Sequence, residues 1–283
     1  MPAQITERLL TLPHGVTLMT YAVGQGPPLL FLPGSSADFR LRSPVLQSAL
    51  VEHFALITFE PRGLGRSSGP PVPWTMRDFA LDSLAVLDAY GVTSAYVVGE
   101  SFGAMVAQVL LVHAPHRLKA AALCGGSAGG SAGQSLAFHR LMPLDPRQRA
   151  EIYLLHLNAQ HQAIKRSDPH RFDAMVATRC AFEASFLGGL CQPDGYVRLL
   201  EARAAHDCAE ALASVKQSLV LILGGEDDRI APPENQTALH GLLKNSLLKM
   251  FAGGHDFLFT TPAPVDWILD RWVRPSTPQA PAG

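Results

Sequence analysis

The 283-residue sequence has little excess charge and little that would direct it to a membrane or to nucleic acid. Its 23 Lys and Arg nearly balance 24 Asp and Glu, the formal net charge is −1, and no long run of one sign occurs. Nucleic acid and anionic membranes are therefore not expected as partners. No apolar run reaches 18 residues, so no membrane span is expected. Because the first eight residues lack a basic region followed by an apolar core, we expect no signal peptide and a cytoplasmic location.

Cysteine is scarce, and its spacing matches no common metal or redox motif. Cys124, Cys180, Cys191 and Cys208 form no Cys-x-x-Cys pair and no zinc-like cluster. Reduced thiols are expected, and a Cys180–Cys191 bridge is the alternative for an exported protein. The sequence implies no metal and no cofactor. Aromatic residues make up only 7% of the chain, so nothing favours stacking on a large planar ligand.

What the chain has in quantity is apolar sequence in short segments. Hydrophobic residues make up 47%, enough for the core of one large domain. Strand-like segments alternate with helical ones, which predicts an α/β fold: a mostly parallel eight-stranded sheet flanked by helices. The first two strands flank a turn signal and predict an opening hairpin. The expected strands are 5–12, 16–23, 29–32, 54–59, 95–98, 118–123, 219–223 and 247–251.

One helix of this core has a clear start signal. Thr75 and Asp78 have the spacing of a capping box and predict a helix that ends before Gly91. From the helical period we expect Leu81 to face the sheet and Asp82 to face water.

The pattern changes after the strand at 118–123. The run 125–133 consists of Gly, Ser and Ala, and we expect it to be flexible, either as a hinge or as a solvent-exposed connector. Helical segments follow, with almost no strand signal. An inserted helical cap explains this better than a long loop, which is improbable in a compact domain. The expected helices are 146–157, 170–187 and 194–205.

These features give a division of the chain. Residues 1–125 and 213–275 are expected to form the core, and residues 126–212 the helical cap or lid. The segment 276–283, rich in Pro and small residues, is expected to be a disordered tail.

The stretch Gly99–Gly103 carries the strongest functional signal. A Gly-x-Ser-x-Gly sequence between a strand and a helix is typical of a nucleophile elbow, a turn so tight that small residues must flank the serine. Ser101 would project at the start of the helix, where the backbone N–H of Phe102 can face an oxyanion. The sequence predicts Ser101 as a nucleophile; an ordinary glycine-rich turn is the alternative.

A serine nucleophile needs a base and an orienting acid. His255 lies in a glycine-containing turn after the last strand and is the predicted base; His206, at the end of the cap, is the alternative. Glu226, Asp227 and Asp228 follow an apolar strand. Asp228 is the predicted acid and Asp227 the alternative, although a solvated acidic turn would also explain three consecutive carboxylates. The order nucleophile, acid, base agrees with an α/β-hydrolase triad.

Five segments in this order make a more specific pattern than any one of them: 32–36, 60–67, 99–103, 225–232 and 254–256. With them, the chain resembles the α/β-hydrolase fold superfamily over about residues 5–273. The resemblance implies that the N–H of Ser35 is the second oxyanion donor. Pro33 and Glu60 replace the family's usual His and Asp, and the 60–67 segment is expected to stabilise a turn. Serine at position 101, where dehalogenases and epoxide hydrolases use a carboxylate, argues against those two chemistries.

The sequence thus predicts a serine hydrolase that acts on a small carbonyl substrate, a carboxylic ester or lactone, through Ser101, His255 and Asp228. The alternatives are C–C bond hydrolysis, acyl transfer or perhydrolysis by the same triad, and a non-catalytic ligand-binding protein of the same fold. The substrate pocket is expected between sheet and cap. Its candidate lining residues, each of which would also suit plain core, are Phe102, Phe138, Met142, Phe182, Phe186 and Leu187.

Overall fold

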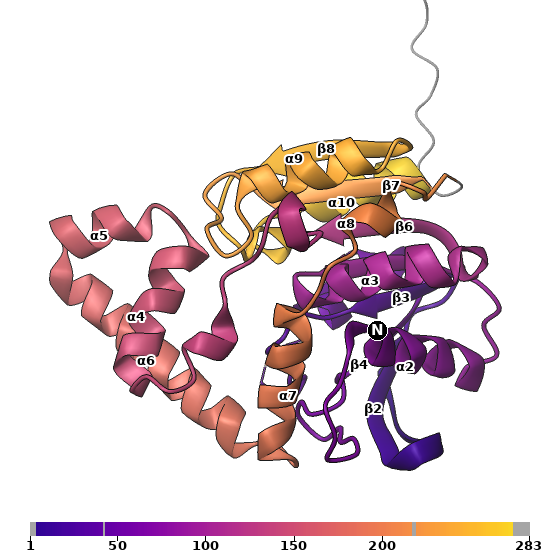
Figure 1. Ribbon diagram of the computed structural model, residues 1–283, viewed down its shortest axis with the longest axis horizontal. Coiled ribbons are helices and arrows are strands. Elements are labelled where there is room, and N and C mark those ends of the chain that lie inside the picture. Colours follow the sequence, from indigo (N-terminus) through magenta and orange to yellow (C-terminus); the bar gives the residue numbers. More distant parts are fainter. Residues whose placement is uncertain (1–3, 42, 217–218, 274–283) are drawn as a thin grey trace, which may run out of the picture.

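A computed structural model describes residues 4–41, 43–216 and 219–273, which contain one eight-stranded sheet (Figure 1). The strand order is β1-β2-β4-β3-β5-β6-β7-β8, with β2 antiparallel to β1 and β4 and all other pairs parallel. The predicted α/β fold and opening hairpin are confirmed. The predicted tail at 276–283 lies outside the described residues. The strands are β1 (Thr6–Leu12), β2 (Val16–Val23), β3 (Pro28–Leu32), β4 (Ala55–Phe59), β5 (Ala95–Glu100), β6 (Leu118–Cys124), β7 (Val220–Gly225) and β8 (Ser246–Phe251).

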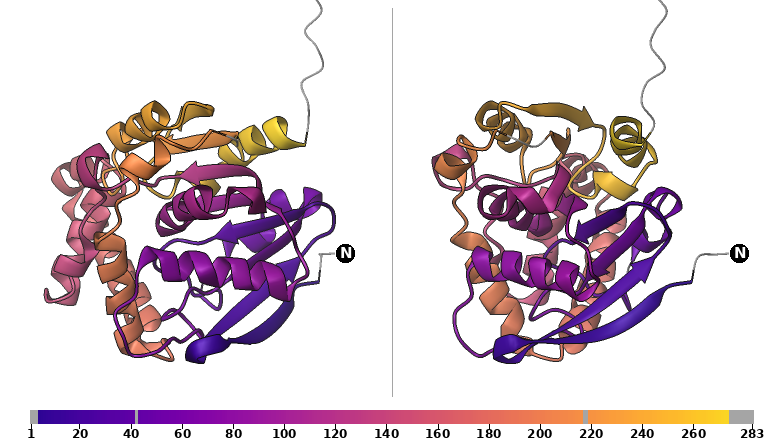
Figure 2. Two further views of the ribbon diagram at one scale, coloured as in Figure 1. Left: turned by 45° about the vertical axis from the view of Figure 1, so that its right-hand side comes forward. Right: turned by 90° about the vertical axis from the view of Figure 1, so that its right-hand side faces the viewer.

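Both faces of the sheet are covered, which explains why its central strands are continuously apolar. In β3, Leu30 and Leu32 belong to the core on one face, and Leu29 and Phe31 to the core on the other. Helices α2, α3, α8 and α9 pack on the first face and α1 and α10 on the second (Figure 2). These helices are α1 (Leu50–His53), α2 (Met76–Ala89), α3 (Phe102–His113), α8 (Ala209–Leu212), α9 (Pro233–Leu242) and α10 (Ala263–Trp272).

Helix α2 begins as predicted but presents a different face to the core. The Thr75 N–H donates to Asp78 Oδ2 at 2.7 Å, and the Thr75 hydroxyl accepts from the Asp78 N–H, so the capping box is present. The expected orientation is wrong: Leu81 is 53% exposed, whereas Asp82 is 3% exposed. The Asp82 carboxylate accepts two hydrogen bonds from the Arg62 guanidinium, at 2.7 and 2.6 Å. A buried carboxylate needs such a partner, and the fold brings it from the segment after β4.

Before α8, the chain between β6 and β7 forms four helices, of which α4, α5 and α6 stand apart from the sheet (Figure 1). The fourth, α7, packs against the first face of the sheet through Leu199 and Leu200. Ala150 and Leu154 of α4 and Phe172 and Val176 of α6 form a separate small core. The predicted helices match α4, α6 and α7 to within one residue at each end, and α5 was not predicted. These helices are α4 (Pro146–Leu157), α5 (His161–Ser167), α6 (Pro169–Gly188) and α7 (Pro193–Ala204).

The first part of the glycine-rich run after β6 is packed, so the expected solvent exposure is wrong for residues 125–129. Residues 125–129 are buried, and Ala128 O accepts a hydrogen bond from the Cys208 N–H at 2.8 Å. Gly129 has a φ of +81°, and a Cβ there would overlap the carbonyl oxygen of His206. Small residues are needed here because two backbone segments approach closely.

Two further expectations concern the whole chain. All four cysteines are free, so the alternative Cys180–Cys191 bridge is absent, and Cys124 is buried in the core. In the ranges that the structure describes, no helix is long and apolar enough to span a membrane.

Candidate active site

Ser101 occupies a strained turn between β5 and α3. Its φ of +53° is the only positive φ among the described non-glycine residues, a conformation that costs about 1–3 kcal/mol and clusters at functional sites. A Cβ on Gly99 would overlap the carbonyl of Gly103, and a Cβ on Gly103 would overlap the carbonyl of Leu32. The glycines two residues before and after Ser101 are therefore required by close backbone contacts, as the sequence pattern predicts.

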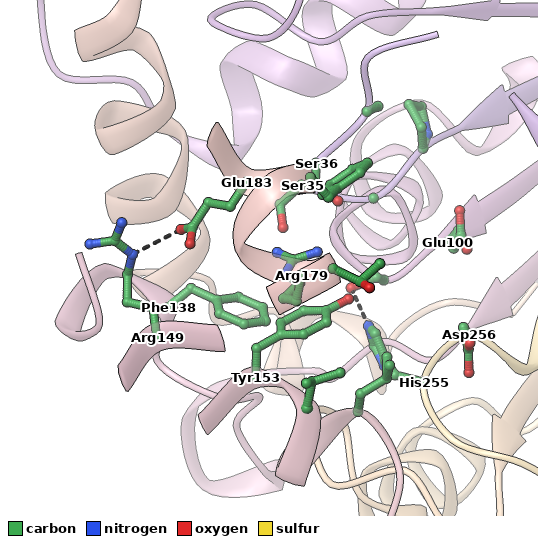
Figure 3. A pocket seen from close by; sticks show the side chains of 18 of the residues that line it. Ser35, Ser36, Glu100, Phe138, Arg149, Tyr153, Arg179, Glu183, His255 and Asp256 are labelled. Carbon is green, nitrogen blue, oxygen red and sulfur yellow. Dashed lines mark hydrogen bonds and ion pairs between the residues drawn. The ribbon is translucent and has the colours of Figure 1, made fainter. Parts of the chain in front are cut away.

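Three side chains from the carboxyl ends of β5, β7 and β8 form one hydrogen-bonded chain. His255 Nε2 lies 2.8 Å from Ser101 Oγ, the hydrogen bond drawn at His255 in Figure 3. On the other side of the ring, His255 Nδ1 lies 2.7 Å from Asp228 Oδ2. Because an ionised carboxylate only accepts hydrogen bonds, Nδ1 carries the proton of neutral His255. Nε2 is then free to accept the proton of the Ser101 hydroxyl.

The two aspartates considered for the acid position have different partners. Asp228 is 1% exposed, and its Oδ1 accepts hydrogen bonds from the N–H groups of Ile230 and Ala231 at 2.7 and 2.9 Å. Asp227 Oδ2 instead accepts from the Gln160 side chain at 2.6 Å. The structure thus brings Asp228, and not Asp227, to His255.

The two residues predicted to supply oxyanion donors, Phe102 and Ser35, lie near Ser101. Phe102 is the first residue of α3, and the N–H groups of a first helical turn have no intrahelical acceptor. Ser35 follows Gly34, whose Cα faces Ser101 closely enough that an added Cβ would lie 3.7 Å from the Ser101 Cβ. Both Ser35 and Ser101 line the same cavity.

The end of α4 is hydrogen-bonded to the loops that carry Asp228 and His255. The His255 N–H donates to the carbonyl of Leu157 at 2.7 Å, and the Arg229 N–H donates to the carbonyl of His156 at 2.9 Å. The Ala159 N–H donates to the carbonyl of Asp227 at 2.7 Å. The inserted helices therefore contact the site through backbone hydrogen bonds as well as side chains.

A cavity of about 670 Å³ lies above Ser101, between the sheet edge and the inserted helices. Of the predicted lining residues, Phe138, Met142 and Phe182 line it, and Phe102, Phe186 and Leu187 do not. The sequence analysis missed its polar wall. Helical spacing could have revealed part of this wall. The residues of α6 that line the cavity recur every three or four positions, so the polar ones lie on the same helix face as Met175 and Phe182. The missed polar residues of the inserted helices include Arg149, Tyr153, His161, Arg171, Thr178, Arg179 and Glu183.

Comparison with known proteins agrees with the fold described above. The model of the alpha/beta hydrolase fold family matches residues 27–262. The chain belongs to this family. RutD of Caulobacter segnis, named for carbamate hydrolysis, is 28% identical to this hydrolase over 76% of the chain and 79% of RutD.

Two other proteins are similar over greater lengths. The poly(3-hydroxyalkanoate) depolymerase of Ectopseudomonas oleovorans is 26% identical over 87% of this hydrolase and 84% of the depolymerase. The solved 2-hydroxy-6-oxo-6-phenylhexa-2,4-dienoate hydrolase of Rhodococcus sp. strain RHA1 has a TM-score of 0.73. It is 20% identical over 95% of this chain and 98% of its own. This last likeness shows the fold alone.

His206, the alternative base, lies elsewhere in the hydrolase. It is 6% exposed, and its Nε2 lies 3.1 Å from Gln108 Oε1 on α3. Burial lowers the pKa of His206 to about 4. The structure therefore gives it a neutral, buried position away from Ser101.

The lowered pKa of His206 predicts that the free energy of unfolding depends on pH. Between about pH 4 and 6.5 the unfolded chain binds a proton at His206 that the folded chain does not. The free energy of unfolding should therefore decrease as the pH falls through this window, by about 2–3 kcal/mol from this residue. Urea unfolding at pH 7.5 and 4.5 should show a smaller loss in His206→Gln than in wild type. The exposed His113→Gln is the control, and an unchanged loss in His206→Gln would contradict the prediction.

Residues 60–67 form a turn after β4 that is held together by the Glu60 side chain. Glu60 is fully buried and accepts hydrogen bonds from the Tyr21 hydroxyl at 2.7 Å and the Arg66 N–H at 2.6 Å. Burial raises the pKa of the Glu60 carboxyl. Glu60 does not line the cavity, which agrees with the expected turn-stabilising role. Within the described ranges, no three His, Cys, Asp or Glu side chains are grouped to hold a metal ion.

Proposed function

We propose that this α/β hydrolase is a serine hydrolase that cleaves a small carboxylic ester or lactone through an acyl-enzyme. The observation that carries the proposal is the continuous hydrogen-bonded chain from Ser101 through His255 to buried Asp228. It lies at the wall of a cavity large enough for a small substrate. The names of two relatives, a carbamate hydrolase and a polyester depolymerase, also refer to acyl compounds.

In the proposed mechanism His255 Nε2 takes the proton of Ser101 as its Oγ attacks the carbonyl carbon. Asp228 keeps the proton of neutral His255 on Nδ1 and stabilises the imidazolium that forms. The N–H groups of Phe102 and Ser35 donate to the oxyanion, each contributing about 3–4 kcal/mol to transition-state stabilisation. His255 then protonates the leaving group, and a water molecule activated by His255 releases the acid from Ser101.

We further propose that residues 126–212 act as the cap over this site and residues 1–125 and 213–275 as the core. The separate apolar cluster between α4 and α6 and the contribution of α4, α6 and α7 to the cavity wall support this division. In a cap of this kind, its side chains select the substrate while the core supplies the chemistry.

The same triad serves other reactions, and products distinguish them. An ester yields an alcohol and an acid, whereas hydrolysis of a C–C bond yields a new C–H bond. Acyl transfer or perhydrolysis would deliver the acyl group to an acceptor other than water. A non-catalytic binding protein would be stabilised by its ligand without turnover. The hydrogen bond between Ser101 and His255 favours a catalytic role.

A fluorophosphonate tests whether Ser101 is an activated nucleophile. We expect one adduct per chain, located on Ser101 by peptide mass spectrometry, and none in Ser101→Ala. Ser214→Ala, which changes an exposed serine, should label like wild type. If the folded wild-type protein is not labelled, or if Ser101→Ala is labelled equally, the proposal is wrong. Product analysis on ester, lactone and β-diketone panels then identifies the bond.

A further inference from the structure

The cavity wall formed by α6 holds a guanidinium without an acidic partner. The guanidinium carbon of Arg179 lies 3.7 Å from the centre of the Tyr153 ring and 5.1 Å from that of Phe182. Among the described residues no carboxylate forms an ion pair with Arg179. Arg149 in the same wall differs, because it pairs with Glu183 at 2.8 Å and donates to the carbonyl of Met142 at 3.2 Å.

The stacking on Tyr153 limits what Arg179 can bind. A guanidinium whose face covers an aromatic ring keeps its N–H groups along its edge, directed into the remaining space. That edge matches a planar carboxylate, which accepts two parallel hydrogen bonds. Arg179 is half-buried at the cavity wall, where pairing with an anion gains more than it would in bulk water.

The other charges of the cavity favour one orientation of an anionic ligand. Glu100 and Asp256 line the cavity next to the triad, and Figure 3 shows them on one side of His255 with Arg179 on the other. The negative charge of Glu183 is already balanced by Arg149. A carboxylate would therefore be repelled from the Asp256 side and attracted to α6.

We propose that the substrate carries a free carboxylate, remote from the scissile carbonyl, and that Arg179 binds it. The proposal rests on the proposed function in so far as the scissile carbonyl is placed at Ser101. Tyr153 and Phe182 hold the guanidinium in position. The substrate class is thus the half-ester of a dicarboxylic acid, or a lactone with a carboxylate side chain. In both kinds of compound, an apolar chain separates the scissile carbonyl from the free carboxylate.

A matched pair of esters tests this recognition. Mono-4-nitrophenyl adipate and its methyl ester have the same acyl chain and leaving group but differ in the free carboxylate. Hydrogen bonds to a charged group contribute about 1.5–3 kcal/mol, or roughly 10–150-fold in affinity. Wild type should therefore favour the free acid in kcat/KM by at least about tenfold. Arg179→Gln should lose most of this preference, mainly through KM, because kcat/KM should fall much more for the free acid than for the methyl ester.

Two further variants separate charge from geometry. Arg179→Lys keeps the charge but loses the planar fork, so we expect an intermediate preference. Arg166→Gln removes an exposed arginine of the neighbouring helix α5 that does not line the cavity, and it should behave like wild type. Equal kcat/KM of wild type on the two esters, or an equal loss on both in Arg179→Gln, would overturn the proposal.

A binding measurement distinguishes this proposal from the serine mechanism. Calorimetric titration of Ser101→Ala with monomethyl adipate should show binding that is lost in the Ser101→Ala/Arg179→Gln double variant. If wild type hydrolyses neither ester while this binding pattern holds, the hydrolase mechanism fails and carboxylate recognition stands. If wild type hydrolyses both esters and Ser101→Ala does not bind monomethyl adipate, carboxylate recognition fails and the mechanism stands.

Discussion

Ser101→Ala should lower kcat of the hydrolase by roughly a million-fold, because removing one member of a triad that acts as a unit removes nearly all of its contribution. The loss should appear in kcat rather than KM, since the cavity wall is unchanged. Steady-state rates on an ester that wild type cleaves, with the variant purified on unused resin, give the measurement. The far-UV circular dichroism of the variant should match that of wild type.

The control for this loss is Ser214→Ala, an exposed serine outside the cavity. It should retain wild-type kcat within about twofold, as expected for a surface substitution. A loss below about a hundred-fold in Ser101→Ala would assign the nucleophile to another group.

Asp228→Asn should lower kcat by about 10⁴-fold, the scale reported for the same change in a serine protease triad. The side-chain NH₂ of asparagine can donate to Nδ1 of His255, which places the imidazole proton on Nε2. His255 then cannot accept the proton of Ser101, although the shape of the site is kept. Rates measured from pH 6 to 10, together with the thermal unfolding midpoint, separate this effect from a loss of folding.

Asp227→Asn is the matched control for this variant, because Asp227 is adjacent in sequence and hydrogen-bonded to Gln160 instead of His255. Its kcat should remain within about threefold of wild type. The acid would be reassigned if Asp227→Asn lost as much activity as Asp228→Asn.

The sheet could be predicted because its strands carry a local signal. Residues 29–32 and 220–223 are continuously apolar, and each strand is buried on both faces. The turn around Ser101 could be predicted equally well, because a tight strand-to-helix turn requires small residues two positions before and after the serine. The choice of Asp228 over Asp227 depends on loop geometry that sequence spacing alone does not determine.

Features that depend on contacts between distant segments were missed. Helical spacing predicts the wrong face for Asp82 because it contains no information on the partner, Arg62, which follows β4. The run 125–133 was expected to be flexible because glycine permits many conformations. In the structure, glycine is needed there for close contact with the chain at His206. The polar wall of the cavity was missed for a similar reason, since Arg179 meets Tyr153 only when α6 packs against α4.

The backbone hydrogen bonds between the end of α4 and the loops of Asp227 and His255 have a consequence for domain grafting. One way to transfer substrate preference between proteins of this fold is to exchange the helices inserted between β6 and β7. In this chain, residues 156–159 supply two carbonyls and one N–H to the segments that carry Asp228 and His255. A chimera that replaces residues 126–212 as one block therefore also replaces part of the support of His255. Grafts that keep 156–159 native should preserve turnover, and grafts that exchange it should lose kcat even when the new helices fold.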